Sequence, residues 1–264
     1  MKNNLNIDEV MALVMMGKTT KEILKIDLAT FDRLYDENPE LEEYIDKANS
    51  ILDRQEAQGI FSISCQDADF PERLLKIGQD CPAVIHCKGN IELLKEQKAV
   101  AIIGARSADR EGYDKAYNLG KDYAQKGYVI VSGIALGCDT AAHRGCLDVG
   151  GKTIAIVGNG LDITHPKENF ALQQEILEKG GLLLSEQVIG TKANPTRLVA
   201  RNRLQAALSE AVILAQCPEQ SGSLHTMRFA RQYKKKYFAA TFPTRTIANA
   251  GNFDLIERHL ASPL

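Results

Sequence analysis

The stretch YVIVSGIALGCDTAAH, residues 128–143, joins an apolar run rich in β-branched residues to a segment of helical composition. Gly133 and Gly137 stand at the seam between the two. Glycine weakens a strand or a helix. Glycines at this seam therefore indicate that the backbone turns sharply there or that another group approaches it closely. One such group is a phosphate, because a helix N-terminus presents unpaired N–H groups and a partial positive charge. The other interpretation is a tight strand-to-helix turn without a ligand, and this stretch alone leaves both open.

Five further apolar runs accompany this one, separated by amphipathic helical stretches. They are AVAIIG (99–104), TIAIVGNG (153–160), LLLSE (182–186), AVILAQ (211–216) and YFAAT (237–241). Runs that are apolar throughout are typical of strands buried on both faces of a sheet. Their alternation with helices predicts an α/β fold with a doubly wound, mostly parallel sheet. Because ligands of such sheets sit beyond the carboxyl ends of the strands, the turns at Gly104, Gly133 and Gly158 are expected to converge on one crevice.

Residues 1–60 differ from the rest of the chain. Apolar residues recur there at helical spacing, which predicts a small helical N-terminal module. Between Met1 and Gly59 the chain carries 13 Asp and Glu against 7 Lys and Arg, a net charge of −6. We therefore do not expect this module to form a nucleic-acid surface.

The whole chain is close to neutral, with 32 basic against 34 acidic residues among 264. Binding of a nucleic acid therefore requires a local basic patch. One candidate patch runs from Lys192 to Lys236, where nine basic residues face two acidic ones, a net of +7. The three lysines at its end, residues 234–236, are equally well read as a solvated helix end.

Cysteine usage and hydropathy point to an ordinary cytoplasmic protein. The six cysteines contain no C-x-x-C pair and no zinc-ligand spacing, so we expect reduced core thiols. No apolar run approaches the roughly 18 residues of a membrane span. The N-terminus lacks the apolar core of a secretory signal. These features predict a soluble, cytoplasmic protein that makes no use of a membrane.

The first glycine turn, IIGARSAD, combines Gly104 with Arg106. Arginine can bind a phosphate through two parallel N–H bonds, so Gly104 and Arg106 are candidate phosphate contacts. The alternative is an arginine that merely covers the edge of the sheet. The dinucleotide fingerprint is absent, because its second and third glycines are missing here, and NAD is not expected.

Other candidate contacts follow the later runs. TRLVARNRLQAALSE (196–210) places Arg201, Asn202 and Arg203 at the start of a helix, where arginines oppose the macrodipole unless an anion is near. A solvated basic face is the alternative. The remaining candidates are the backbone amides of Gly158 and Gly160 and the segment SGSLHT, with hydroxyl donors at Ser221, Ser223 and Thr226 and close approach at Gly222.

Asp139 and His143 lie four residues apart, on one face of the helix expected to begin near Gly137. That spacing suits two metal ligands, but no third ligand is evident. A structural Asp–His pair or an N-terminal cap is favoured, and no metal is predicted.

Taken together, the motifs resemble the DprA/Smf family of DNA-processing proteins. The matching stretches, in family order, are DFPERLLKIGQDCPAVIHCKGN, IIGARSAD, SGIALGCDTAAH, VGNGLDITHP, LLSE, RNRLQAALSE and SGSLHT, within residues 69 to about 243. The resemblance implies an extended Rossmann-like domain over residues 61–264 that binds single-stranded DNA. It also implies homodimers, protection of incoming strands, and delivery of DNA to the RecA recombinase during natural transformation (competence), without enzymatic activity or a cofactor.

The resemblance also implies which residues contact DNA phosphates. Carried over by motif, they are Gly104, Arg106, Ser132, Gly133, Arg201, Arg203 and Ser221 to Ser223. Some positions depart from the family pattern. Leu136 replaces a usual arginine, Leu198 and Val199 replace a Phe-Pro pair, and His165 replaces tyrosine. The chain also ends soon after the Rossmann-like region, so the winged-helix domain of many relatives is not expected.

Two other functions compete with DNA binding. Nucleotide-processing hydrolases related to phosphoribohydrolases use a P-G-G-x-G-T-x-x-E turn, but Phe229 stands where that glutamate belongs and can act as neither acid nor base. Glu186 is a possible substitute, although a structural role suits it better. A nucleotide sensor would use the same phosphate-binding turns, and a shallow dependence of affinity on salt would distinguish it from a DNA-binding protein.

Overall fold

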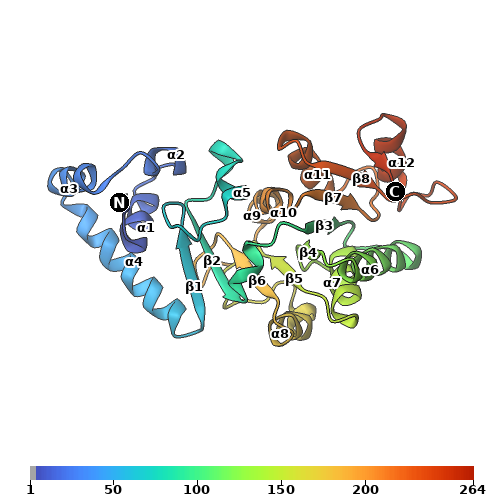
Figure 1. Ribbon diagram of the computed structural model, residues 1–264, viewed down its shortest axis with the longest axis horizontal. Helices are drawn as coiled ribbons and strands as arrows, with labels where there is room; N and C mark the ends of the chain where they lie inside the picture. The colour runs from blue at the N-terminus through green and yellow to red at the C-terminus, as the bar shows by residue number, and fades with distance from the viewer. Residues whose placement is uncertain (1–3) are drawn as a thin grey trace.

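A nine-stranded sheet forms the centre of the protein, described here by a computed structural model for residues 4–264 (Figure 1). Its strands, in spatial order, are β1 (Ile60–Ser64), β2 (Val84–Gly89), β6 (Leu182–Ser185), β5 (Thr153–Ile156), β4 (Val129–Ser132), β3 (Ala99–Ile103), β7 (Ala211–Leu214), β8 (Lys236–Ala239) and β9 (Ser262–Pro263). All neighbours from β6 to β9 are parallel, and β1 and β2 are antiparallel. The predicted mostly parallel α/β sheet is confirmed, and the six apolar runs are β3 to β8.

Helices cover both faces of the sheet. Alternate residues of each strand point to opposite sides, so each strand packs against helices on both faces. Val100 and Ile102 pack with α6 (Arg110–Gln125) and α7 (Cys138–Asp148). Ala101 and Ile103 belong to the buried cluster that includes α10 (Asn202–Leu208) and α11 (Ser223–Gln232). The remaining helices of this part are α5 (Glu72–Leu75), α8 (Phe170–Glu178), α9 (Pro195–Ala200) and α12 (Ala250–Glu257), with 3-10 turns η1 (Gly78–Asp80), η2 (Ile91–Leu94) and η3 (Lys167–Asn169).

The order of the strands fixes where a ligand crevice can form. From β3 the chain builds outward through β4, β5 and β6 on one side, then returns to place β7, β8 and β9 on the other. The connections leaving β3 and β7 therefore diverge to opposite sides of the sheet. A switch point of this kind opens a crevice beyond the carboxyl ends of the strands.

The N-terminal segment is helical, as predicted, with α1 (Ile7–Met15), α2 (Thr20–Ile23), α3 (Leu28–Glu37) and α4 (Glu40–Glu56). These helices pack beside β1 at one end of the molecule (Figure 1). The last helix ends at Glu56 and β1 begins at Ile60, so the type of element changes at the predicted boundary. One buried cluster nevertheless runs across it, because Leu13 and Leu41 belong to the same cluster as Ile63 and Ile85. The division into two domains stays a prediction.

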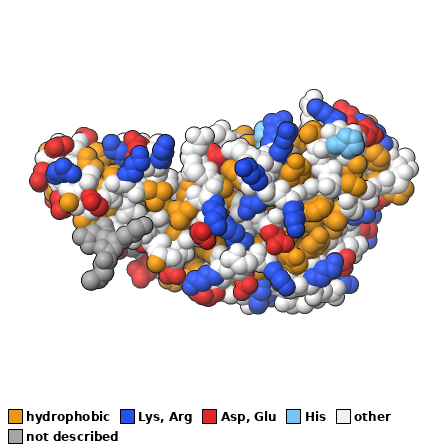
Figure 2. Space-filling view, turned by 45° about the horizontal axis from the view of Figure 1, so that its top comes forward, with side chains coloured by type: hydrophobic (Ala, Val, Ile, Leu, Met, Phe, Trp, Pro, Cys, Tyr) orange, Lys and Arg blue, Asp and Glu red, His pale blue; other side chains and the backbone are white. Residues whose placement is uncertain are grey.

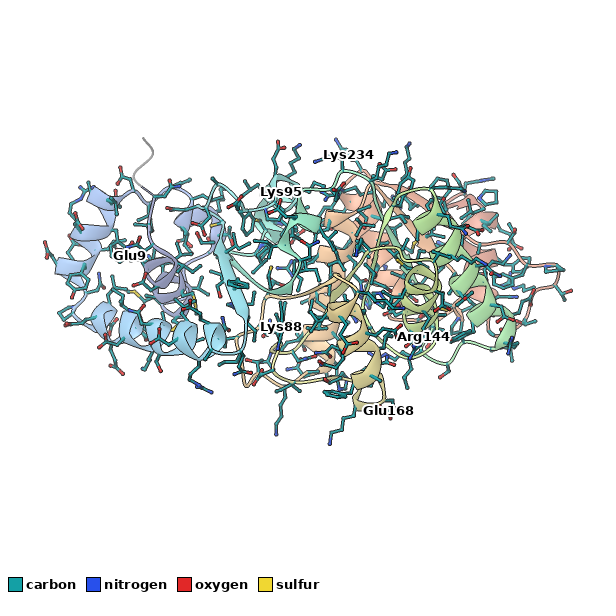
Figure 3. All side chains as sticks on the ribbon, turned by 60° about the horizontal axis from the view of Figure 1, so that its bottom comes forward. Glu9, Lys88, Lys95, Arg144, Glu168 and Lys234 are labelled. Atoms are coloured by element: carbon teal, nitrogen blue, oxygen red, sulfur yellow. The ribbon has the colours of Figure 1, made fainter. Side chains whose placement is uncertain are left out.

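Charged side chains project outward around the sheet (Figure 3). Arg144 of α7 reaches α8, where its Nη1 lies 2.9 Å from Glu175 Oε2. Figure 2 shows Lys and Arg side chains beside apolar ones over the middle of the face it presents. Across residues 4–264, no helix combines the length and apolar character needed to cross a membrane.

Candidate functional site

A pocket of about 680 Å³ lies at the switch point, and we call it the crevice pocket. Five separate segments meet there: the turn after β3, the start of α7, the α9–α10 region, the start of α11 and the loop before α12. Eight of the predicted site residues line it, namely Gly104, Arg106, Arg201, Asn202, Ser221, Gly222, Ser223 and Thr226. Residues separated by more than 100 positions in the sequence thus share one concave surface.

A smaller pocket of about 160 Å³ adjoins the crevice pocket, and we call it the side pocket. Arg106, Ala135, Leu198 and Arg201 line both. The remaining lining residues of the side pocket are Gly133, Leu136, Val157, Gly158, His165 and Pro166. Two more predicted residues, Gly133 and Gly158, therefore lie here rather than in the crevice pocket.

Arg201 lies between α9 and α10 with only 6% of its surface exposed. Its Nη1 donates to the carbonyl oxygen of Ile156, at 2.8 Å. The Gln205 side-chain amide has one orientation in which both its oxygen and its nitrogen find hydrogen-bond partners. In that orientation its oxygen accepts from Arg201 Nη1, and from the Gly133 N–H at 3.1 Å. A Cβ atom on Gly133 would overlap the Arg201 guanidinium. The group that requires close approach at Gly133 is thus an arginine of the protein itself.

Asp139 balances part of this buried charge. It lies at the start of α7 with 6% exposed, and its Oδ2 accepts from the Ala135 N–H at 3.3 Å. Burial raises the pKa of Asp139, and the nearby Arg201 opposes that rise. Burial lowers the pKa of Arg201, and Asp139 opposes the fall. The guanidinium remains protonated, because its ordinary pKa lies above 12.

Arg106 supplies the exposed positive charge of the site. It follows β3, is exposed to solvent and lines both pockets. Within residues 4–264 no carboxylate forms an ion pair with it. Arg106 and Arg201 are close enough that the charge of Arg106 contributes to the lowered pKa of Arg201. An anion bound between them would relieve this repulsion.

The start of α11 forms another part of the lining. The Ser221 and Ser223 hydroxyl oxygens are 2.6 Å apart, and Asn202 Nδ2 donates to the Gly222 carbonyl at 3.3 Å. A Cβ atom on Gly222 would meet nothing within 4 Å, so the backbone there faces open space. The amides of Ser223, Leu224 and His225 are bonded within this turn, to the Ser221 hydroxyl and to the Ser221 and Gly222 carbonyls. This wall therefore offers hydroxyl groups to a ligand rather than free helix amides.

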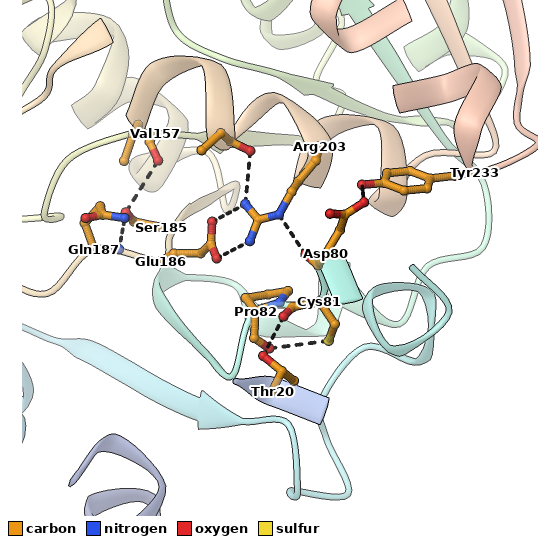
Figure 4. A network of polar contacts seen from close by, with 11 residues as sticks. Thr20, Asp80, Cys81, Pro82, Val157, Ser185, Glu186, Gln187, Arg203 and Tyr233 are labelled. Atoms are coloured by element: carbon orange, nitrogen blue, oxygen red, sulfur yellow. Dashed lines mark hydrogen bonds and ion pairs between the residues drawn. The ribbon is translucent and has the colours of Figure 1, made fainter. Parts of the chain in front are cut away.

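Three predicted site residues lie outside both pockets, and Arg203 is the main correction (Figure 4). Its guanidinium binds both carboxylate oxygens of Glu186, at the end of β6. Its Nε donates to the Asp80 carbonyl at 2.7 Å, and Nη1 donates to Ala200 at 3.0 Å. These bonds engage most of its donors and also occupy Glu186. Arg203 therefore connects α10 to the β6 loop and η1 instead of facing the crevice pocket.

Ser132 and Gly160 also have internal partners. Ser132 is fully buried and its hydroxyl donates to the Ile102 carbonyl at 2.6 Å, which joins β4 to β3. The Gly160 N–H donates to the Thr191 carbonyl at 2.9 Å, so it does not offer an amide to a ligand. The expectation that these two residues contact a phosphate does not agree with this arrangement.

The expected pairing of Asp139 with His143 is also absent from the described contacts. His143 Nδ1 lies 2.7 Å from the Thr153 hydroxyl, and Asp139 instead faces Arg201. Complete burial lowers the pKa of His143 to about 3. In the part of the chain that the structure describes, no three His, Cys, Asp or Glu side chains gather as metal ligands.

Sequence reasoning missed Gln205, Asp139 and Ile247 as pocket residues. Gln205 looks like an ordinary position within a helix, and its role depends on the turn at Gly133. Ile247 is 89% exposed at the rim of the crevice pocket. An apolar residue after a proline-containing loop was the only signal for it.

Known proteins resemble this chain over most of its length. A family model described as DNA recombination-mediator protein A matches residues 61–264. The Smf protein of Synechocystis is 32% identical over 207 residues, which cover 75% of this chain but 52% of that relative. The chain thus spans about half of that protein.

Two solved structures share the fold at similar identity. DNA processing protein A from Streptococcus pneumoniae superposes with a TM-score of 0.75 at 31% identity, covering 100% of this chain and 91% of that one. The Helicobacter pylori protein, whose structure was reported for its unique single-stranded DNA binding mode, gives a TM-score of 0.69 at 32% identity and covers 77% of this chain and 90% of that one. The chain therefore belongs to the DNA recombination-mediator protein A family, also called DprA/Smf.

Proposed function

We propose that this protein binds single-stranded DNA in the crevice pocket without base preference. The observation that carries the proposal is the convergence of Arg106, Arg201 and the start of α11 on one pocket at the switch point of the sheet. Guanidinium groups and serine or threonine hydroxyls donate hydrogen bonds to phosphate oxygens. Because phosphates are common to every sequence, such contacts give affinity that does not depend on the bases.

The rest of the pocket suits the other parts of a nucleotide. Pro195, Leu198, Val199 and Ile247 add apolar surface to the lining of the crevice pocket. A strand of DNA has both a charged backbone and apolar ring faces, and proteins that bind it combine a basic groove with surfaces for the bases. A volume of about 680 Å³ also lies in the range of pockets that hold small ligands.

The biological role proposed here follows the family. Binding would shield single strands from nucleases, and a RecA-type recombinase would receive the DNA from this protein. We further propose a homodimer and a cytoplasmic location. We propose no catalytic step, because Glu186 is paired with Arg203, and Asp139 is buried beside Arg201. Both carboxylates thus face a guanidinium of the protein, and a general acid or base must instead lie within hydrogen-bond reach of the reacting group.

An electrophoretic shift assay with labelled oligo-dT tests this function. Arg106→Ala removes the exposed pocket cation and should shift the binding curve to clearly higher protein concentration. The matched control is Arg110→Ala, which removes an exposed arginine of α6 outside both pockets. Equal binding by the wild type and Arg106→Ala would reject the crevice pocket as the DNA site. Binding of mononucleotides but not of oligo-dT by the wild type would instead favour a nucleotide sensor.

A further inference from the structure

The turn after β4 contains a strained residue, Ile134. Its φ is +60°, a region in which a β-branched side chain crowds the backbone. Within residues 4–264, the other non-glycine residues at positive φ are Lys234 and His259, and neither is β-branched. The Ile134 side chain is fully buried, in the cluster that includes Leu172 and Ile176 of α8. Strain of this kind persists only where the surrounding structure holds the backbone in place.

Asn169, the last residue of η3, holds the carbonyl group of Ile134. Its Nδ2 donates to the Ile134 carbonyl oxygen at 2.7 Å and to the Thr140 hydroxyl at 2.8 Å. That hydroxyl in turn donates to the Ala135 carbonyl at 2.7 Å. An amide nitrogen has two N–H donors, and these two bonds use both of them. Because Asn169 is buried, its loss would leave the Ile134 carbonyl without the donor that satisfies it.

Turn 133–137, which contains Ile134, supports both arginines of the proposed DNA site. A Cβ atom on Gly137 would overlap the carbonyl oxygens of Ala105 and Arg106, so the end of the turn packs against the backbone that carries Arg106. At the start of the turn, Gly133 packs against the Arg201 guanidinium. A change in the φ of Ile134 would redirect the chain between these two contacts. The positions of both arginines therefore depend on the conformation of this one residue.

We propose that Asn169 is a positioning residue for DNA binding, which acts by holding Ile134 at positive φ. The inference rests on the proposed function and adds to it a residue that lines neither pocket. Without the amide of Asn169, the backbone of Ile134 would relax toward negative φ. Arg106 and Arg201 would then lose the arrangement in which one phosphate can bind between them.

The first test is Asn169→Ala, studied by fluorescence anisotropy of the full chain with oligo-dT under conditions where each variant is folded. Loss of one charge-assisted contact should weaken binding by about tenfold. The slope of log K against log salt should also become shallower by about 0.7, the contribution of one phosphate on a single strand. A residue that only stabilises the fold would lower the midpoint of urea denaturation without changing this slope.

The matched control is Asn38→Ala in the N-terminal segment. It also removes an asparagine amide that donates to a backbone carbonyl, that of Leu34 at 2.8 Å, and it lies outside both pockets. This control should keep the affinity and the salt slope of the wild type.

Ile134→Gly provides a rescue that follows from the strain. Glycine adopts positive φ about as readily as negative φ, so a turn with glycine at this position does not need Asn169 to maintain it. Ile134→Gly alone loses a buried side chain and should be less stable, yet it should bind oligo-dT within about twofold of the wild type. Adding Asn169→Ala to this variant should weaken binding by less than about twofold, instead of by about tenfold.

The outcomes distinguish the role of Asn169 from the function on which it rests. Wild-type affinity and salt slope for folded Asn169→Ala would overturn that role while DNA binding stands. An equal loss from Asn169→Ala in the wild type and in Ile134→Gly would also overturn it, because the strain at Ile134 would then be irrelevant to binding. Failure of the wild type to bind oligo-dT at any salt concentration would overturn the proposed function and this inference together.

Discussion

The Arg201 guanidinium packs against the backbone of Gly133, in the space that a side chain at residue 133 would fill. This contact fixes the turn after β4 against the junction of α9 with α10. The same arginine also reaches the end of β5, through its bond to Ile156. Three segments of the sheet edge are thus joined by one side chain.

Gly133→Ala should displace Arg201 and leave Asp139 without its compensating charge. Removing one partner of a buried charge pair costs about 3–5 kcal/mol. We expect a loss of about 2–4 kcal/mol in the free energy of unfolding, because part of the charge can move into the open pocket. Urea denaturation measures this. Gly222→Ala is the control, since its Cβ meets nothing within 4 Å, and the change should lie within about 0.5 kcal/mol. Similar stability of the two variants would contradict the role assigned to Gly133.

Arg203→Ala should reduce stability without altering the proposed DNA site. It breaks the ion pair with Glu186, in which the Arg203 side chain is 14% exposed and the Glu186 side chain is 18% exposed. The loss should be about 2–4 kcal/mol, since the carboxylate stays largely buried without a partner. Anisotropy with oligo-dT, at a temperature where the variant is folded, should give wild-type affinity. Weakened binding by the folded variant would place Arg203 in the DNA site.

Arg106→Ala should change how DNA affinity depends on salt. Each phosphate neutralised on a single strand contributes about 0.7 to the slope of log K against log salt. Loss of one contact should make the slope shallower by about that amount. The measurement is a series of anisotropy titrations at several salt concentrations, with Arg110→Ala expected to keep the wild-type slope. An unchanged slope for Arg106→Ala would mean that Arg106 makes no phosphate contact.

His86 should make the protein less stable as the pH falls. Burial lowers its pKa to about 4, and its Nδ1 lies 2.8 Å from the Ser62 hydroxyl and 3.1 Å from Gln55 Nε2. An unfolded histidine titrates near 6.5, so between about pH 6.5 and pH 4 the unfolded state binds more protons than the folded state. Stability is therefore lost as the pH falls through this window, by up to about 1.4 kcal/mol per pH unit for this group.

A comparison with His86→Gln isolates that contribution. Urea denaturation at several pH values should give a less pH-dependent free energy of unfolding for the variant. The difference between the two curves removes the effect of other groups, including His143, which burial also keeps neutral. Parallel curves for the two proteins would show that His86 does not titrate differently in the folded and unfolded states.

Local patterns were enough to predict strands β3 to β8, since each of these is largely apolar. They also led to Arg106, because it lies in the turn directly after a strand near the centre of the predicted sheet. Arg203 illustrates the limit of such reasoning. Its partner Glu186 lies 17 residues away on another element, and only the folded chain brings the two together. Ser132 could not be predicted for the same reason, because its acceptor, Ile102, belongs to a neighbouring strand.

The crevice pocket draws its walls from turns at both ends of a long stretch of chain, from Gly104 to Thr226 and beyond. During synthesis, a growing polypeptide that ends before Ser221 lacks one of those walls altogether. Under the proposed function, unfinished chains on the ribosome would be poor competitors for DNA, and capture of a strand would report that both halves of the sheet have come together.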